Sequence, residues 1–249
     1  MIEIKSLVKK FPHKNKQGQE TYKIAVEGLS LSIGEGEVFG LLGPNGAGKT
    51  TTIRMLTMQT KATSGSIFYN GMELESHELE LKSLIGVVPQ HVNFDQDLTV
   101  EENMELHARL HHIPAADRKC RIDELLAYVE LSEVVNDGVR RLSGGMKRRL
   151  LIARALLHKP RILFMDEPTV ALDPQVRRKI WDLVRQLAVG GVTVFLTTHY
   201  IEEAEALCDR VAILNKGKLV AVDSPAHLRD NFQEANLEEV FLKLTEEKA

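Results

Sequence analysis

One run of eight residues constrains the fold of this chain more than any other part of its sequence. Residues 43–50 read Gly-Pro-Asn-Gly-Ala-Gly-Lys-Thr and match the pattern GxxxxGK[ST] without deviation. The apolar run 38–42 predicts a strand buried on both faces, and residues 51–57 predict a helix. A glycine-rich turn between a strand and a helix directs backbone amides towards one point and forms a cradle for phosphate oxygens.

The cradle carries the side chains that a nucleotide site needs. Lys49 offers a positive charge to the β- and γ-phosphates, and the hydroxyl of Thr50 can ligate Mg²⁺. The start of the following helix adds its partial positive charge. We therefore predict that this run binds the phosphates of a nucleotide, ATP, together with Mg²⁺. The predicted nucleotide-binding residues of this run are Gly43, Pro44, Asn45, Gly46, Ala47, Gly48, Lys49, Thr50 and Thr51.

A pair of acidic residues follows a second buried strand, predicted at residues 162–165. A carboxylate at the carboxyl end of a parallel strand faces the crevice where ligands bind. We expect Asp166 to hold Mg²⁺ through water and Glu167 to polarise the attacking water as a general base. Adjacent acids after a strand can also be solvated turn residues, but the phosphate cradle upstream favours the catalytic interpretation.

A third motif, Leu-Ser-Gly-Gly-Met at residues 142–146, precedes a basic helix that we expect to continue to Leu157. Ser143 is a natural N-cap, and the two glycines after it leave backbone amides accessible at the helix start. This segment predicts a second phosphate-binding surface. The alternative is a flexible loop followed by a basic helix.

The order of the predicted elements indicates how the chain is organised. Alternating strands and helices predict a largely parallel sheet covered on both sides. Residues 1–36 read as strands with turns, and residues 12–20 among them look like a polar surface loop. Residues 99–159 show helical periodicity rich in charge, which predicts a helical subdomain inserted into the sheet. Thr99 and Glu102 have the spacing of a capping box at its start.

The carboxy-terminal segment has the pattern of an amphipathic helix. Its apolar residues recur at i, i+3, i+4 and i+7, at Leu237, Val240, Phe241 and Leu244. We expect this helix to pack on its own chain. The alternative is a contact in a dimer.

Composition excludes several kinds of protein. Thirty-two basic and 35 acidic residues leave a net charge of −3, which gives no electrostatic footprint for nucleic acid. Cys120 and Cys208 lie far apart without a CxxC spacing, which argues against a disulfide framework or a zinc site. No apolar run approaches the roughly 20 residues that span a bilayer, and the first residues lack a signal-peptide core. We expect a soluble cytoplasmic protein that requires a separate spanning subunit for any work at a membrane.

The order and spacing of these motifs resemble the ATP-binding cassette (ABC) family of nucleotide-binding domains over nearly the whole chain. The Ser-Gly-Gly sequence at 143–145 lies shortly before the acidic pair, with the phosphate cradle far upstream. The resemblance implies an α/β fold: a P-loop NTPase core with a mainly parallel sheet, an amino-terminal antiparallel β subdomain and an inserted helical subdomain. It also implies one ABC ATPase domain over 1–249, with the core at 1–90 and 160–224, the helical signature subdomain at 91–159 and a helical tail at 225–249.

The resemblance assigns the third motif to a second nucleotide. In that family the signature of one copy contacts the γ-phosphate held by the other copy, which implies a head-to-tail dimer with two nucleotides at its interface. Met146 replaces the glutamine that most often ends the signature, but subunits resembling exporters tolerate methionine there. The signature residues implied here are Leu142, Ser143, Gly144, Gly145 and Met146.

Further positions acquire roles through the same resemblance. Gln90 matches the glutamine that joins the Mg²⁺ shell and couples the site to a membrane partner, so the implied metal ligands are Thr50, Gln90 and Asp166. His199 matches the switch histidine that helps to position the attacking water, which makes Glu167 and His199 the implied catalytic pair. The loop between the two sites would consist of Ala171, Leu172 and Asp173. Val170 replaces a small residue before that loop and puts a polar contact across the dimer in doubt.

An aromatic residue from the amino-terminal strands usually stacks on adenine in this family. Phe11 and Tyr22 are the candidates. Phe11 is favoured because it follows Val-Lys-Lys at residues 8–10 as the aromatic residue of the family does. Ordinary packing is the alternative for either ring.

Two longer segments indicate which kind of cassette this is. Residues 143–149 and 197–210, together with the tail at 237–245, are similar to subunits that pair with ABC-2 type export permeases. The resemblance therefore implies the ATPase of a membrane exporter, held at the cytoplasmic face of the cell membrane by an integral-membrane permease. The alternative is a soluble ABC ATPase, for example of the iron–sulfur cluster assembly type. The sequence does not identify the exported compound or the permease.

Overall fold

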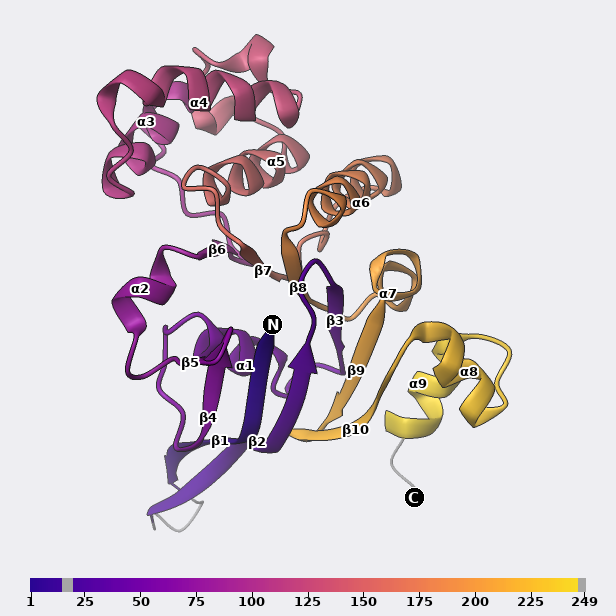
Figure 1. The fold of residues 1–249 in the computed structure, drawn as a ribbon. Helices are drawn as coiled ribbons and strands as arrows, with labels where there is room; N and C mark the ends of the chain where they lie inside the picture. The colour runs from indigo at the N-terminus through magenta and orange to yellow at the C-terminus, as the bar shows by residue number, and fades with distance from the viewer. Residues whose placement is uncertain (15–19, 246–249) are drawn as a thin grey trace.

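Two β-sheets and a group of helices make up the computed structural model of the chain, which describes residues 1–14 and 20–245 (Figure 1). The six-stranded sheet runs through the middle of the molecule and has the order β10-β9-β3-β8-β7-β6. Strands β9, β3, β8, β7 and β6 are parallel, while β10 pairs antiparallel with β9. The strands of this sheet are β3 (Val38–Leu42), β6 (Ile85–Val88), β7 (Ile162–Asp166), β8 (Thr193–Thr198), β9 (Arg210–Asn215) and β10 (Lys218–Asp223).

The central sheet is buried on both faces because its strands supply side chains to two separate cores. In β3, Phe39 and Leu41 join the core shared with the second sheet, while Val38 and Leu42 join the core beneath the helices. All five residues of β3 are buried, as the continuous apolar run predicts. The carboxyl ends of the parallel strands therefore lie together at one edge of a sheet that is packed on both faces.

The second sheet is antiparallel and has the order β2-β1-β4-β5, which confirms the predicted amino-terminal β subdomain. Its strands are β1 (Ile2–Lys14), β2 (Glu20–Ile33), β4 (Ser64–Tyr69) and β5 (Met72–Glu73). The prediction of a surface loop at 12–20 is wrong at its ends, because Pro12 pairs with Tyr22 and Lys14 with Glu20. The remainder of that prediction, residues 15–19, lies outside the described residues. Strand β4 pairs with β1 as far as Val8, so beyond that residue β1 has β2 as its partner and tolerates a proline.

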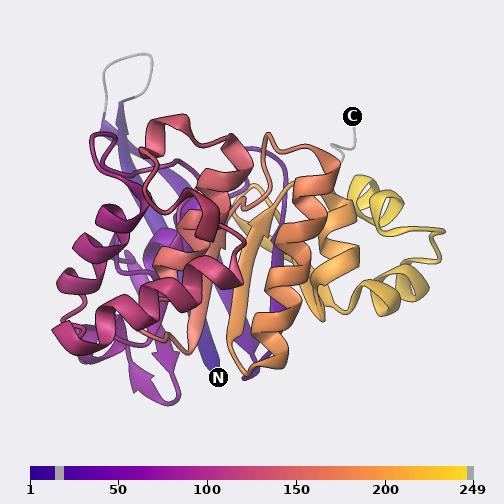
Figure 2. The ribbon, with the colours of Figure 1, turned by 90° about the horizontal axis from the view of Figure 1, so that it is seen from above.

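Helices α3, α4 and α5 follow β6 and precede β7, and they lie together on one side of the molecule (Figures 1 and 2). The predicted capping box is present: Thr99 accepts a hydrogen bond from the Glu102 amide, and Glu102 accepts one from the Thr99 amide. The helix bounds are α1 (Lys49–Leu56), α2 (Glu78–Lys82), α3 (Val100–Leu110), α4 (Ala115–Tyr128), α5 (Gly144–Ala155), α6 (Pro174–Val189), α7 (Ile201–Leu207), α8 (Pro225–Phe232) and α9 (Leu237–Thr245), with 3₁₀ turns at Ser132–Val134 and Val139–Arg141.

The carboxy-terminal helices α8 and α9 lie at the side opposite α3 and α4 (Figure 2). Helix α9 contacts α7 and β9, and its Leu237 and Val240 are buried. The Asn215 side chain donates a hydrogen bond to the Leu244 carbonyl at 3.3 Å. The tail thus packs on its own chain. Within the described residues, none of the helices has the length and apolarity to cross a membrane.

Candidate active site

The phosphate cradle connects β3 to α1 in the context that the sequence predicts. Helix α1 begins at Lys49, two residues earlier than expected. Gly48 has φ 107°, and a Cβ at this position would stand 2.5 Å from the Ala25 carbonyl oxygen. A side chain is therefore excluded both by backbone conformation and by the close approach of β2.

The Lys49 side chain lies inside the cradle and is 5% exposed. Its Nζ donates to the carbonyl oxygens of Gly43 at 2.6 Å and Pro44 at 3.2 Å. Burial lowers the pKa of Lys49, while the charges of Glu167 and Asp166 act in the opposite direction. The ammonium group is thus held by loop carbonyls, which a phosphate could replace as partners.

The acidic pair stands at the end of β7, where the parallel register places Asp166 beside Thr197 of β8. Thr197 Oγ1 donates to Asp166 Oδ1 at 2.6 Å and accepts a hydrogen bond from the Glu167 amide at 3.1 Å. Thr50 Oγ1 donates to the same Asp166 oxygen at 3.4 Å. Glu167 has φ 47°, a left-handed conformation that is uncommon for a glutamate and recurs at functional sites.

Three elements bring side chains to the Glu167 carboxylate. Gln90, which follows β6, donates from Nε2 to Glu167 Oε2 at 2.9 Å. His199 Nδ1, beyond the end of β8, lies 3.3 Å from Glu167 Oε1, and Lys49 Nζ lies 3.9 Å from the same atom. The folded chain therefore brings together the predicted general base, the glutamine, the histidine and the cradle lysine.

The cleft above these residues encloses about 560 Å³ and extends to the amino-terminal sheet. Phe11 and Lys23 lie at that end and are partners across the β1–β2 ribbon. Tyr22 is 70% exposed and precedes Lys23 in the strand, so its side chain points to the opposite face. Of the two aromatic candidates, the structure places Phe11 at the cleft.

Oxygen donors beside the cradle fit a magnesium ion. The Thr50 hydroxyl and the Asp166 carboxylate lie 3.4 Å apart, and Gln90 reaches the same region through its contact with Glu167. Hydroxyl, carboxylate and amide oxygens are the hard ligands that Mg²⁺ uses, together with water and substrate phosphates. In the part of the chain that the structure describes, no cluster of three His, Cys, Asp or Glu residues forms a separate metal site.

The signature residues form the start of α5 and lie outside this cleft. Ser143 is the N-cap and accepts a hydrogen bond from the Met146 amide at 3.2 Å, as predicted. A Cβ on Gly145 would stand 2.7 Å from Val176 Cγ1, so the glycine allows α5 to approach α6 closely. The helix ends at Ala155, two residues before the predicted end. Among the described residues that line the cleft above Glu167, none belongs to the signature.

The predicted inter-subunit loop lies beside the signature of the same chain. The Leu172 side chain approaches Gly144, whose Cβ would stand 3.9 Å from Leu172 Cδ2. Asp173 accepts a hydrogen bond from the Val176 amide at 3.0 Å and caps α6, and Ala171 has φ 59°. Val170, before this loop, lines the cleft above Glu167.

Sequence reasoning missed three polar residues around the site. Thr197 holds Asp166, Arg148 contacts the segment that contains Gln90, and Glu203 is fully buried. Glu203 Oε1 accepts hydrogen bonds from Thr169 Oγ1 at 2.8 Å and Trp181 Nε1 at 3.1 Å. Burial raises the pKa of Glu203 despite these bonds. Strand register could have revealed Thr197, because it ends the strand beside Asp166.

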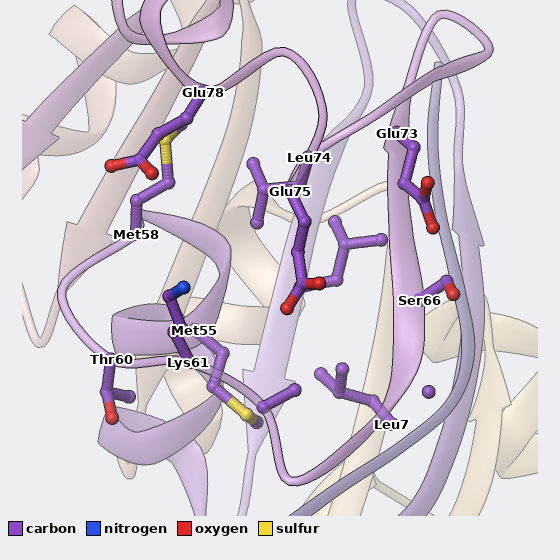
Figure 3. A pocket seen from close by; sticks show the side chains of 13 residues that line it. Leu7, Met55, Met58, Thr60, Lys61, Ser66, Glu73, Leu74, Glu75 and Glu78 are labelled. Carbon is purple, nitrogen blue, oxygen red and sulfur yellow. The ribbon is translucent and has the colours of Figure 1, made fainter.

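A second hollow of about 110 Å³ lies between α1 and the segment from β5 to α2. Figure 3 shows the carboxylates of Glu73, Glu75 and Glu78 around it, together with Met55 and Met58. Among the described residues, this hollow shares no lining residue with the cleft above Glu167. It therefore belongs to a different part of the surface.

The fold and the cleft define a class of protein, the P-loop nucleotide-binding ATPase cassettes. The family model for the ABC transporter matches residues 26–170. This chain belongs to the ABC transporter family.

Several curated relatives are export and resistance proteins. The Nod factor export ATP-binding protein I of Ralstonia nicotianae is 44% identical over 215 residues, which are 86% of this chain and 66% of that protein. The linearmycin resistance ATP-binding protein of Bacillus subtilis is 44% identical over 206 residues, which are 83% of this chain and 66% of that protein. Each match therefore spans slightly less than two thirds of the relative's own length.

Solved structures agree with the family assignment. A structure described as the ATP-binding subunit of an ABC transporter has a TM-score of 0.83 and 27% identity, and it covers 99% of this chain and 100% of that chain. A bacterial ABC transporter cassette solved as a dimer has a TM-score of 0.80 and 30% identity over 90% of this chain and 98% of that chain. The predicted P-loop core with its inserted helices is confirmed.

Proposed function

We propose that this chain is the ATP-hydrolysing subunit of a membrane exporter and that it works as a head-to-tail dimer. One observation carries the proposal: the cleft around Lys49 and Glu167 is assembled within one chain, while the signature at Ser143 lies outside it. A second copy would present its signature helix to the nucleotide of the first. Closure over two ATP molecules would then supply the force for transport.

The residues in the cleft have the chemistry for hydrolysis. Glu167 would accept a proton from the attacking water, and His199 would help to place that water, since both line the same cleft. Lys49 would neutralise charge on the transferred phosphoryl group, which is mainly a matter of positioning and electrostatics. Mg²⁺ would be held by Thr50, Asp166 and Gln90 and would supply positive charge that neutralises the phosphates.

The expected partners follow from the family and the names of the relatives. Relatives at 44% identity are named for Nod factor export and for linearmycin resistance. By analogy, an integral-membrane permease of the ABC-2 type would carry the exported substance and hold this chain at the cytoplasmic face of the membrane. Hydrolysis would loosen the dimer and return the permease to its starting state.

Replacement of the general base tests the dimer cycle. We expect Glu167→Gln to retain ATP binding and to lose turnover by about a thousandfold, because proton transfer contributes on the order of 10²–10⁴ to rates. The trapped protein should elute as a dimer from a sizing column with Mg-ATP. A variant that remains a monomer at high ATP and protein concentrations would contradict the proposal.

Co-purification from membranes tests the exporter role separately. A tagged chain should bring with it a polypeptide with predicted membrane spans, and ATP hydrolysis by the complex should respond to the exported compound. Recovery of iron–sulfur assembly proteins instead would favour the soluble alternative. The unassembled chain serves as the control for intrinsic ATPase activity.

A further inference from the structure

Arg148 lies two residues beyond the signature and is 5% exposed, although arginine is seldom buried. Its Nη1 donates to the Pro89 carbonyl at 2.7 Å, and its Nη2 donates to the Gln90 carbonyl at 2.9 Å. The planar guanidinium presents its donors in fixed directions. It therefore fixes two successive carbonyls of the segment that carries Gln90.

Gln90 continues this contact to the reacting centre. Its Nε2 donates to Glu167 Oε2 at 2.9 Å. A continuous path thus runs from α5 through the Arg148 guanidinium and residue 90 to the predicted general base. The other end of α5 is Ser143, the N-cap in the signature.

Electrostatics favour a charged arginine at this place. Burial lowers the pKa of Arg148, whereas the charges of Asp166, Glu203 and Glu167 raise it. Arginine remains protonated in proteins. Its hydrogen bonds go to the two backbone carbonyls, while its positive charge lies close enough to the three carboxylates to interact with them.

A second buried arginine strengthens the attachment of this segment to α5. Arg154 is 6% exposed, and its Nη1 donates to the Asn93 carbonyl at 3.2 Å. Its guanidinium also lies over the Phe94 ring, 4.7 Å from the centroid. Residues 89–94 are therefore bound to the same helix at both ends.

We propose that Arg148 is a positioning residue that couples the two nucleotides of the dimer by tying Gln90 to the signature helix. This inference rests on the proposed function, because it assumes that each signature reaches the other copy's nucleotide. Because the Arg148 guanidinium holds the carbonyls of residues 89 and 90, these residues and α5 move together. The position of a copy's signature therefore depends on the position of Gln90 in that copy's own site.

Arg149 offers a matched control on the same helix. Its Nη1 donates to the Val129 carbonyl at 2.6 Å and contacts Glu130, within the helical subdomain. Arg148→Met and Arg149→Met each remove one mostly buried arginine. Without nucleotide, Arg148→Met should increase amide hydrogen exchange in residues 90–92, whereas Arg149→Met should increase it near residues 128–131.

A double-mutant cycle tests whether Arg148 acts through Gln90. Arg148→Met should lower kcat by about tenfold or more in the natural background, since misplaced catalytic groups cost up to about a hundredfold. In a Gln90→Ala background the same change should cost less than about twofold, because the side chain that it positions is gone. Arg148→Lys should recover part of the rate, and binding of labelled ATP to dilute protein should stay unchanged.

The outcomes separate this inference from the function on which it rests. Equal losses of kcat in the two backgrounds would overturn the positioning role. Unchanged hydrogen exchange of residues 90–92 in Arg148→Met would also overturn it, whatever the activity. A natural protein without ATPase activity would contradict the proposed function, and the exchange measurement would still decide whether Arg148 holds the Gln90 segment.

Discussion

Two regions of the molecule differ in how many groups of their expected site one chain supplies. They are the phosphate cradle with its cleft, here the cradle edge, and the signature at the start of α5, here the signature edge. At the cradle edge, Glu167 is approached by side chains from three elements, and Thr197 holds the acid beside it. At the signature edge, Ser143 caps its own helix and Gly145 packs against Val176. The ends of parallel strands form a crevice within a single folded chain. The start of a helix, in contrast, has backbone amides without partners in the helix, which a ligand from outside can occupy.

The largest expected effects on ATP binding and turnover come from substitutions that remove one functional side chain at each edge. Lys49→Ala should weaken ATP binding to a single copy by about tenfold to a hundredfold, because the lost bond involves a charged donor. Ser143→Ala should leave that binding unchanged and remove turnover, since the serine would act on the partner's nucleotide. Equilibrium binding of labelled ATP to dilute protein, followed by steady-state hydrolysis, measures both effects.

Mixing the two variants sharpens the comparison. A mixed dimer contains one intact site, built from the Ser143→Ala cradle and the Lys49→Ala signature. If copies pair at random, the mixture should recover roughly a quarter of the natural rate, given the isologous twofold pairing of such dimers. Mixing either variant with itself is the control. No recovery from a mixture of two folded variants would place both residues in the same site of one chain.

A smaller effect is expected at the far end of the cradle cleft. Phe11→Ala should weaken ATP binding about tenfold, because stacking of a base on an aromatic ring contributes about 1–3 kcal/mol. Tyr22→Ala is the matched control: it is the neighbouring aromatic residue on the ribbon, and its side chain is 70% exposed on the other face. GTP and ATP affinities measured for both variants give the result. A larger loss for Tyr22→Ala would reverse the assignment.

Local sequence patterns predicted the cradle edge well because its pieces are contiguous. The strand, glycine turn and helix around Lys49 occupy one short stretch, and the acidic pair ends one buried strand. The α/β class and the inserted helices follow from the same periodicities. The position of Gln90 and His199 beside Glu167 required strand order, which the sequence indicated only through family resemblance.

Long-range contacts explain what was missed. Arg148 meets Gln90 across 58 residues of sequence, and Thr169 meets Glu203 across 34. The sequence pattern of a helix does not indicate which of its basic or acidic residues will be buried. The ribbon near Pro12 was mistaken for a loop because its residues beyond Lys10 are exposed on both faces, which removes the apolar alternation that marks a strand.

The smallest expected effect is a difference between the two edges in how their stability depends on pH. His107 lies in α3, behind the signature helix, with Nε2 3.3 Å from Arg154 Nη1. Burial, followed by the charges of Arg154 and His111, lowers the pKa of His107 to about 4. The unfolded chain binds this proton at higher pH than the folded chain does. The free energy of unfolding should therefore fall as the pH decreases from about 6.5 towards 4.

His107→Gln tests this dependence, because glutamine keeps a hydrogen-bond acceptor for Arg154 and does not titrate. The variant should lose less stability than the natural protein between pH 7 and 5, with the difference measured by urea unfolding at several pH values. Leu106→Gln, at an exposed neighbouring position, changes no titratable group and should give a pH-independent difference. If exchange of α3 and α5 rises first in acid while β7 and β8 stay protected, the signature edge is the acid-sensitive one. The opposite order would break the comparison, because it would show that the cradle edge depends more on pH than the helices behind the signature.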